Sequence, residues 1–250
     1  MRSVFGAEQL PDALVKLIHE RTGGNPFFLE EVCRTLQEEG AVRVRNDRVS
    51  VVGSLAGLQL PDSVQAVIRT RLDRIDHAAR DLLRRASVVG REFSVGVLRR
   101  IVDDASDLDG LLVGLKERGL IRQARVVPEP IYRFQNVLTQ EVAYDSLLKR
   151  QKKELHGRVG KAVEHVLGER LDEHYDILAA HFAEAEDWVK AVHYGQLSAH
   201  RARGLSQFTD ALNALERTRS WLERVPENEH TRECWIALIQ EEVHVHEIVR

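Results

Sequence analysis

The chain has 250 residues, a hydrophobic content of 43%, a charged content of 30% and a formal net charge of −3. This is an ordinary soluble composition that can bury one large core or two to three small ones, and the pattern favours several small ones. No apolar run approaches the roughly 18–20 residues that cross a bilayer, and nothing near Met1 resembles a signal sequence, so we expect a cytoplasmic protein or a cytoplasmic piece of one.

The charge is spread unevenly along the chain. Residues 1–68 carry a net charge of −2, residues 69–161 carry +7 and residues 162–250 carry −8. A basic middle can attract the acidic last third or another acidic surface. The two cysteines, Cys33 and Cys234, are far apart in helical patterns, so we expect no disulfide and a reducing compartment.

The first 59 residues predict two helices and a hairpin. A helix from Leu10 to Arg21 ends at two glycines, and Asn25-Pro26 starts another, because asparagine is a favoured N-cap and proline suits the first helical position. Its buried face would carry Phe28, Leu29, Val32, Cys33 and Leu36. Residues 42–52 alternate in the manner of a two-stranded hairpin that turns at Asn46-Asp47.

The next segment has the order of a winged helix-turn-helix domain. A helix is expected from Pro61, where Asp62 and Gln65 can form a capping box, with its polar side at Arg69, Arg71 and Arg74. Three short helices follow at about 76–88, 94–102 and 106–118, then two strands at 120–121 and 131–134 with a proline-containing wing between them.

The second strand runs directly into a helix, which Asn136 or Thr139 can cap. Compact modules precede this junction and long helices follow it, so it is the place where one half of the chain would report to the other. From Gln151 the pattern is helical, at about 151–167, 172–185, from Trp188, and from the cap candidate Ser206 to before Pro226. The small residues among Trp188, Ala191, Gly195 and Ala199 are typical of stacked helical hairpins, and the pattern resembles degenerate tetratricopeptide repeats.

No catalytic constellation can be read from the sequence. The Gly160-Lys161 pair lacks a phosphate-binding loop, since residue 155 is leucine and residue 162 is alanine. Adjacent carboxylates such as Glu30 and Glu31 are expected to be solvated, and His174 and His181 are expected on helix surfaces. We therefore expect no enzyme activity, no metal and no cofactor in this chain.

A winged helix also suggests DNA binding, with the third helix in the major groove. The exposed positions of that helix carry Asp107, Asp109, Lys116 and Glu117, which repel a polyanion more than they attract it. A DNA-binding transcriptional regulator remains the main alternative, and a protein-interaction scaffold is another.

Four stretches together resemble one family: residues 22–31 (Thr-Gly-Gly-Asn-Pro-Phe-Phe-Leu-Glu-Glu), residues 60–73, residues 86–93 (Ala-Ser-Val-Val-Gly-Arg-Glu-Phe) and residues 133–156. They are similar to the part that follows the ATPase core in AAA-like (STAND) signal-transduction ATPases. These ATPases are often fused to class III adenylyl or guanylyl cyclases and end in tetratricopeptide-like repeats. The resemblance covers most of residues 8–225.

The resemblance implies a regulatory segment and three candidate nucleotide contacts. In such proteins the Gly-x-Pro turn of a helical lid resembles the element that touches adenine, which here is Gly24 and Pro26. The winged helix often offers a histidine to the phosphate where this chain has Asn136, which can donate a hydrogen bond but carries no charge. ATP or ADP is expected in the parent protein rather than in this chain alone.

We therefore predict a mainly α fold with a helical lid and β-hairpin at 1–59, a winged helix-turn-helix domain at 60–150 and tetratricopeptide-like repeats at 151–250. The repeats would hold a protein partner or small ligand and couple its binding to a nucleotide-dependent switch in an upstream ATPase core. No nucleic acid and no membrane are expected as partners. A Gly-x-x-x-x-Gly-Lys-Ser/Thr loop encoded upstream of Met1 would settle the class.

Overall fold

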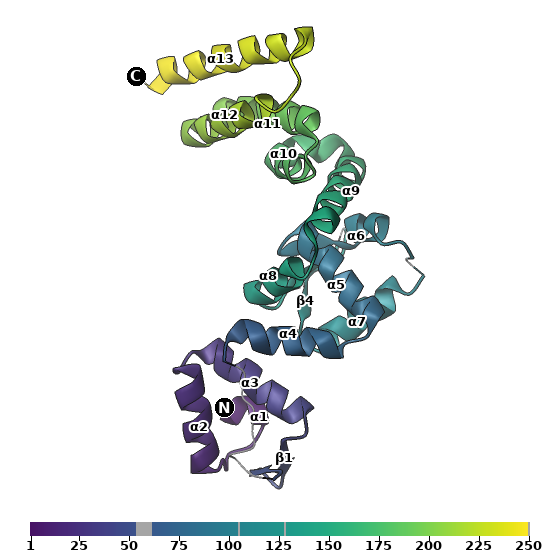
Figure 1. Ribbon diagram of the computed structural model, residues 1–250, viewed down its shortest axis with the longest axis vertical. Coiled ribbons are helices and arrows are strands. Elements are labelled where there is room, and N and C mark those ends of the chain that lie inside the picture. The colour runs from purple at the N-terminus through teal and green to yellow at the C-terminus, as the bar shows by residue number, and fades with distance from the viewer. Residues whose placement is uncertain (54–61, 105, 128, 250) are drawn as a thin grey trace.

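The computed structural model describes residues 1–53, 62–104, 106–127 and 129–249. In Figure 1 the chain runs along an elongated molecule, with the N-terminal helices at one end and the last helix, α13 (Glu229–Val249), at the other. The described residues are mainly helical and include a two-stranded and a three-stranded sheet, both antiparallel. The predicted fold class, mainly α with small β-hairpins, is confirmed.

The N-terminal unit consists of three helices and a hairpin. Its elements are α1 (Arg2–Phe5), α2 (Asp12–Thr22), α3 (Pro26–Glu38), β1 (Val42–Arg45) and β2 (Arg48–Val51). The hairpin turns where predicted, with positive φ at Asn46 and Asp47, as a two-residue hairpin loop requires. The sequence did not predict α1, which has a single turn.

The middle of the chain has the element order of a winged helix. Its elements are α4 (Val64–Arg74), α5 (His77–Val89), β3 (Glu92–Ser94), α6 (Val95–Ile101), α7 (Leu108–Glu117), β4 (Ile121–Arg125) and β5 (Ile131–Phe134). The strand order is β3-β5-β4. The sequence missed β3, whose three residues are too few for an alternating pattern.

The expected start of α4 was displaced by one residue from the observed cap. Pro61 lies outside the described residues, and the N-cap is Ser63 rather than Asp62, because the Ser63 hydroxyl accepts a hydrogen bond from the backbone N–H of Ala66. A serine hydroxyl satisfies an orphan amide as well as a carboxylate does.

The rest of the chain stacks helix against helix. Its elements are α8 (Val137–Asp145), α9 (Lys149–Leu167), the 3₁₀ helix η2 (Gly168–His174), α10 (Tyr175–Glu184), α11 (Trp188–Gly204), α12 (Phe208–Leu222) and α13. The close packing predicted at Gly195 is observed, since a Cβ there would clash with Thr218 of α12. Gly160, which the sequence did not single out for packing, also lies close to its neighbour: a Cβ there would lie 2.8 Å from Cζ of Phe182. Ser206 is not the cap of α12. It has a φ of 59° in the turn, and Gln207 is the N-cap.

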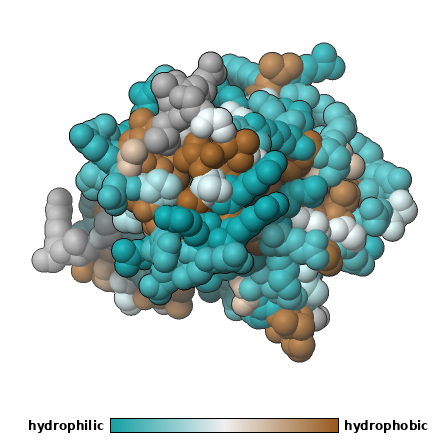
Figure 2. Space-filling view, turned by 90° about the horizontal axis from the view of Figure 1, so that it is seen from below, coloured by the Kyte–Doolittle hydropathy of each residue, from teal (hydrophilic) through white to brown (hydrophobic). Residues whose placement is uncertain are grey.

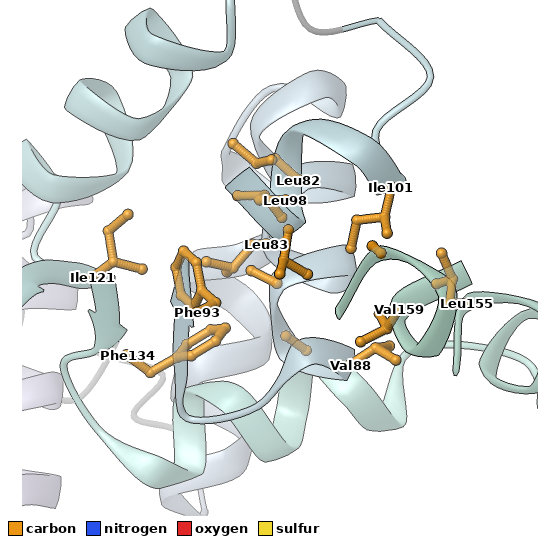
Figure 3. Packing of buried hydrophobic residues seen from close by; sticks show 14 of the residues in the cluster. Leu82, Leu83, Val88, Phe93, Leu98, Ile101, Ile121, Phe134, Leu155 and Val159 are labelled. Carbon is orange, nitrogen blue, oxygen red and sulfur yellow. The ribbon is translucent and has the colours of Figure 1, made fainter. Parts of the chain in front are cut away.

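The largest hydrophobic cluster extends from α4 through the winged helix into α9, α10 and α11. Phe93 of β3 and Phe134 of β5 pack edge to face in it, with ring centroids 5.6 Å apart. Figure 3 shows Leu155 and Val159 of α9 on the side of this cluster where Ile101 and Val88 lie. The first helix of the repeats is therefore part of the winged-helix core.

The surface at the N-terminal end is mainly hydrophilic. Figure 2, which views the molecule from that end, shows hydrophobic residues in separate groups among hydrophilic ones. None of the helices in the described ranges is long and apolar enough to cross a membrane.

Candidate functional site at the joints between the units

The predicted Gly24-x-Pro26 turn is exposed between α2 and α3. Gly24 has a φ of 76°, a conformation that side-chain-bearing residues rarely adopt, and a Cβ there would lie 3.3 Å from Cε1 of His19. Pro26 is the first residue of α3, and the Asn25 side chain accepts hydrogen bonds from the N–H groups of Phe27 and Phe28. Local capping fixes the shape of this turn and leaves it open to a ligand.

Asn136 caps α8. Its Oδ1 accepts a hydrogen bond of 2.8 Å from the backbone N–H of Leu138, and the side chain is half-buried. Gly24 and Pro26 lie at the start of α3, whereas Asn136 lies at the start of α8. The three candidate nucleotide contacts therefore lie on two separate elements.

A buried arginine joins the N-terminal unit to the middle of the chain. Arg71 of α4 is only 6% exposed, and its guanidinium binds the carboxylate of Glu31 on α3, which is 7% exposed. Nη2 of Arg71 also donates 2.9 Å to the backbone carbonyl of Arg118, at the C-terminal end of α7. We call the group Glu31, Arg71 and the Arg118 carbonyl the arginine joint.

The turn that follows α7 brings this joint close to the start of α8. The N–H of Gln135, next to Asn136, donates 3.0 Å to the carbonyl of Leu120. A Cβ on Gly119 would lie 3.1 Å from Nη1 of Arg34 on α3. Residues 118–120 thus lie next to α3 of the N-terminal unit on one side and contact the segment that carries Asn136 on the other.

Two expectations about these charged residues were wrong. Glu31 was expected to be solvated and Arg71 to lie on the polar side of α4, but both are buried. The sequence held a signal for Arg71, since it lies three residues after Ile68 and four before Ile75, which are both buried. Which carboxylate pairs with it depends on the packing of α3 against α4, and no local pattern encodes that contact.

A second polar cluster joins the winged helix to the repeats. The Tyr144 hydroxyl of α8 lies 3.0 Å from Nε2 of His156 on α9, and Nδ1 of His156 lies 2.9 Å from Nδ1 of His181 on α10. The two imidazoles are 7% exposed each. Because one Nδ1 must donate and the other must accept, the two rings are not both imidazolium in this arrangement. His181 was expected on a helix surface, and that expectation was wrong.

Burial controls the protonation of this histidine pair. Desolvation lowers the pKa of His181 to about 4. Desolvation, together with the nearby His181 and Lys152, lowers the pKa of His156 to about 4. Both rings are therefore neutral at physiological pH, and a pair of neutral rings is compatible with the contact between their Nδ1 atoms, in which one donates and the other accepts.

Three clefts on the repeats could receive a partner. One of about 440 Å³ lies between the wing and α9–α10, and its walls include Phe93, Val163 and Ile177. Another of about 540 Å³ lies between η2, α11 and α12 and has the acidic residues Asp172, Asp176 and Asp210 among its walls. The third, of about 620 Å³, lies at the start of α9 and is lined by basic and tryptophan side chains. No group of three or more His, Cys, Asp or Glu side chains in the described ranges could hold a metal ion.

The helix that would read DNA carries few free cations. Asp109 of α7 lies 3.6 Å from the guanidinium of Arg99 on α6, and Asp107 and Glu117 are also exposed on or beside α7. Paired and acidic side chains on this face disfavour a polyanion.

Comparisons with known proteins match parts of this chain. A family described as a domain of unknown function (DUF8739) matches residues 1–50, which span α1 to α3 and most of the β1–β2 hairpin. A protein named only as uncharacterized, from Rhizobium meliloti (strain 1021), is 30% identical over 156 residues, which are 62% of this chain and 14% of that protein. The chain thus resembles a small part of a much longer relative.

Proposed function

We propose that this chain is a non-catalytic, cytoplasmic regulatory segment of a multidomain signal-transduction ATPase. The helical repeats bind a partner, and the winged helix passes the bound state to the lid over the nucleotide of an ATPase core. The observation that carries this proposal is the arginine joint, because one buried side chain ties the lid helix α3 to the end of α7. The match to a small part of a long relative is consistent with a segment of this kind.

The arginine joint suits a switch between two arrangements. A buried ion pair adds little net stability, but its geometry is specific, and a buried charge that loses its partner is strongly destabilising. Rotation of the winged helix away from α3 would separate Arg71 from Glu31, so intermediate positions would be unfavourable. Packed interfaces of this kind favour discrete states over gradual deformation.

The repeat side of the switch has its own rigid connection. Helix α9 packs on α5 and α6 of the winged helix and on α10 of the repeats. The Tyr144–His156–His181 cluster adds a polar contact across α8, α9 and α10. A partner that moves α10 or α11 therefore acts on the winged helix through α9.

In the parent, the nucleotide would contact the exposed Gly24-x-Pro26 turn and the amide of Asn136, and the ATPase core would supply the phosphate-binding loop. Because the chain lacks that loop, isothermal calorimetry of residues 1–250 with ATP or ADP should show negligible affinity. Micromolar affinity of this chain alone would contradict the proposal. So would a parent gene that encodes no Gly-x-x-x-x-Gly-Lys-Ser/Thr loop.

The role of the joint can be tested in the parent ATPase. We expect Arg71→Met to change nucleotide turnover or nucleotide exchange by roughly 5-fold or more, the scale of a typical coupling free energy. Arg69→Met, a change two residues away on the exposed face of α4, should leave both rates unchanged. Equal rates in the wild type and both variants would exclude a coupling role for Arg71.

DNA binding is the second candidate, because the described strands and helices have winged-helix order. A gel-shift titration over salt separates the two. Steep loss of DNA affinity with rising salt would support the regulator, and no retardation at low salt would support the ATPase segment.

A further inference from the structure

A basic pocket lies where α9 begins. We use this name for the cleft lined by Lys149, Arg150, Lys153, Trp188, Trp221 and Arg224. Lys152 also lines it, and the carboxylates in its wall are Glu184 and Glu186. Five cations against two carboxylates leave an excess of three positive charges in a cleft of about 620 Å³.

Several of these cations already have partners. Lys153 binds Glu186 at 2.5 Å, and Lys152 binds Asp145 at 3.2 Å. The Arg224 guanidinium lies 4.6 Å from the centre of the Trp188 ring. Lys149 and Arg150 are different: both are exposed, and neither has a carboxylate within ion-pair distance among the described residues. Lys149 is near enough to Glu186 to contribute, after Lys153, to the lowered pKa of that carboxyl, but it forms no ion pair with it. Both side chains can therefore still meet an anionic partner.

The fold does not account for Lys149 and Arg150. They occupy the first turn of α9, which contains no acidic residue. A helix carries partial positive charge at its N-terminus, so cations there are unfavourable to the helix itself. An arrangement that opposes local stability and lines a cleft is typical of a binding surface.

The pocket also offers apolar contact area. Trp188 starts α11 and Trp221 lies near the end of α12, and both are half-buried. Tryptophan and arginine are the residues most often found at the energetic centre of protein interfaces. Leu148, directly before Lys149, is 70% exposed beside this pocket.

We propose that the basic pocket binds an acidic peptide segment of a partner protein, with peptide carboxylates on Lys149 and Arg150 and an apolar or aromatic peptide side chain against Trp188 and Trp221. The inference deepens the proposed function, since it names the class of partner that the repeats hold. A peptide fits this pocket better than nucleic acid does. Glu184 and Glu186 in the pocket wall would repel the closely spaced phosphates of a nucleic acid. A peptide has fewer and more widely spaced negative charges, so its carboxylates can avoid these two residues.

The position of the pocket links it to the rest of the chain. Its walls come from α9, the turn between α10 and α11, and the end of α12. Lys153 is three residues from His156 on α9, and that helix continues into the winged-helix core through Leu155 and Val159. A peptide bound here would hold α9 against the following repeats.

The test is a peptide-display selection on the full chain of 250 residues without nucleotide. We expect enriched peptides with several Asp or Glu residues and at least one Leu, Phe or Trp. The affinity for a selected peptide is measured by tryptophan fluorescence and calorimetry. It should fall at least 10-fold in the double variant Lys149→Glu/Arg150→Glu. The matched control is Arg43→Glu/Arg45→Glu on the exposed hairpin, which should bind as the wild type does.

The melting temperature of each variant shows whether lost peptide binding is caused by unfolding. Because acidic residues suit a helix N-terminus, the Lys149→Glu/Arg150→Glu variant should melt at or above the wild-type temperature while losing the peptide. If that variant fails to fold, Lys149→Ala/Arg150→Ala replaces it, with the same expected loss. No enrichment, enrichment of neutral or basic peptides, or equal binding by all variants would overturn the inference. None of these outcomes depends on ATP, so the ATPase proposal is tested separately.

Discussion

Arg71 shows how much depends on one side chain in this molecule. It contacts Glu31 and Glu38 of α3 and the backbone of Arg118, so groups from two units converge on it. Of these carboxylates, Glu31 is buried while Glu38 remains exposed to water. Loss of Arg71 would therefore leave a single uncompensated charge, on Glu31.

We expect Arg71→Ala to lower the free energy of unfolding by about 3–5 kcal/mol, because it leaves the Glu31 carboxylate buried without a partner. The double variant Glu31→Leu/Arg71→Met should recover most of that loss, since apolar residues of similar volume need no partner. Urea denaturation measures both, and Arg69→Ala should stay within about 0.5 kcal/mol of the wild type. A double variant as unstable as Arg71→Ala would show that the ion pair itself is required.

The histidine pair predicts a dependence of stability on pH. Folded His156 and His181 have pKa values of about 4, below the ordinary value of 6.5, so the unfolded chain binds more protons as the pH falls through 6.5. Stability should therefore fall by roughly 2–4 kcal/mol between pH 7.5 and pH 5 through this pair. Urea denaturation across this range should show a flatter profile for His181→Gln, whereas His193→Gln, an exposed change, should keep the wild-type slope. Identical slopes for all three proteins would contradict the assignment.

The sequence alone predicts few of the contacts between individual side chains. It found the caps at Asn25 and Asn136 because capping is a local interaction. It missed the Glu31–Arg71 and His156–His181 pairs, whose members are 40 and 25 residues apart. Such pairs are set by how helices pack, and the spacing of charges along one helix does not reveal the partner on another.

At the scale of elements, two glycines of α9 differ in what lies opposite them. A Cβ on Gly160 would lie 2.8 Å from Cζ of Phe182, whose ring is fully buried in α10. A Cβ on Gly157 would meet Cβ of Ala185 at 3.5 Å, an ordinary contact. The two positions are one turn apart, so they form a matched pair.

We expect Gly160→Ala to destabilise the protein by about 1–3 kcal/mol, because α10 must shift away from the added methyl group. Gly157→Ala should instead stabilise it by about 0.5–1 kcal/mol, since alanine has the higher helix propensity and space is available. Thermal and urea denaturation of the two variants report the difference. Similar effects at both positions would mean that α9 and α10 are not as close as described.

Most elements follow from the sequence because their signals are local. The start of α3, the β1–β2 turn and the three helices of the winged helix were expected from caps, glycines and apolar spacing. The two elements that the sequence did not predict are both very short. The helix α1 and the strand β3 have four and three residues, too few to show a period, and they are held by contacts with distant segments such as the pairing of β3 with β5.

At the scale of the whole molecule, one cluster crosses the predicted boundary at residue 150. Leu155, Val159 and Val163 of α9 are buried with Leu98 and Ile101 of α6. A fully buried leucine or valine contributes roughly 1.5–3 kcal/mol, and whole domains are stable by only about 5–15 kcal/mol. The winged helix therefore depends on the first helix of the repeats.

We expect a chain of residues 1–150 to lose cooperative unfolding, because it exposes the α9 side of this core. A chain of residues 1–206, which keeps α9, α10 and α11, should unfold cooperatively. Circular dichroism in a denaturant series is the suitable measurement, since residues 1–150 contain no tryptophan. A cooperative transition in the shorter chain would show that the winged helix folds without α9.

The uninterrupted length of α9 has a mechanical consequence. Its 19 residues correspond to about 28 Å of helix at 1.5 Å per residue. If α9 tilts by roughly 5° about one end, its other end moves by about 2.5 Å, as the end of a lever does. That travel is close to the difference between a hydrogen bond made and a hydrogen bond broken, so a small swing among the repeats is enough to disturb polar contacts in the neighbouring module.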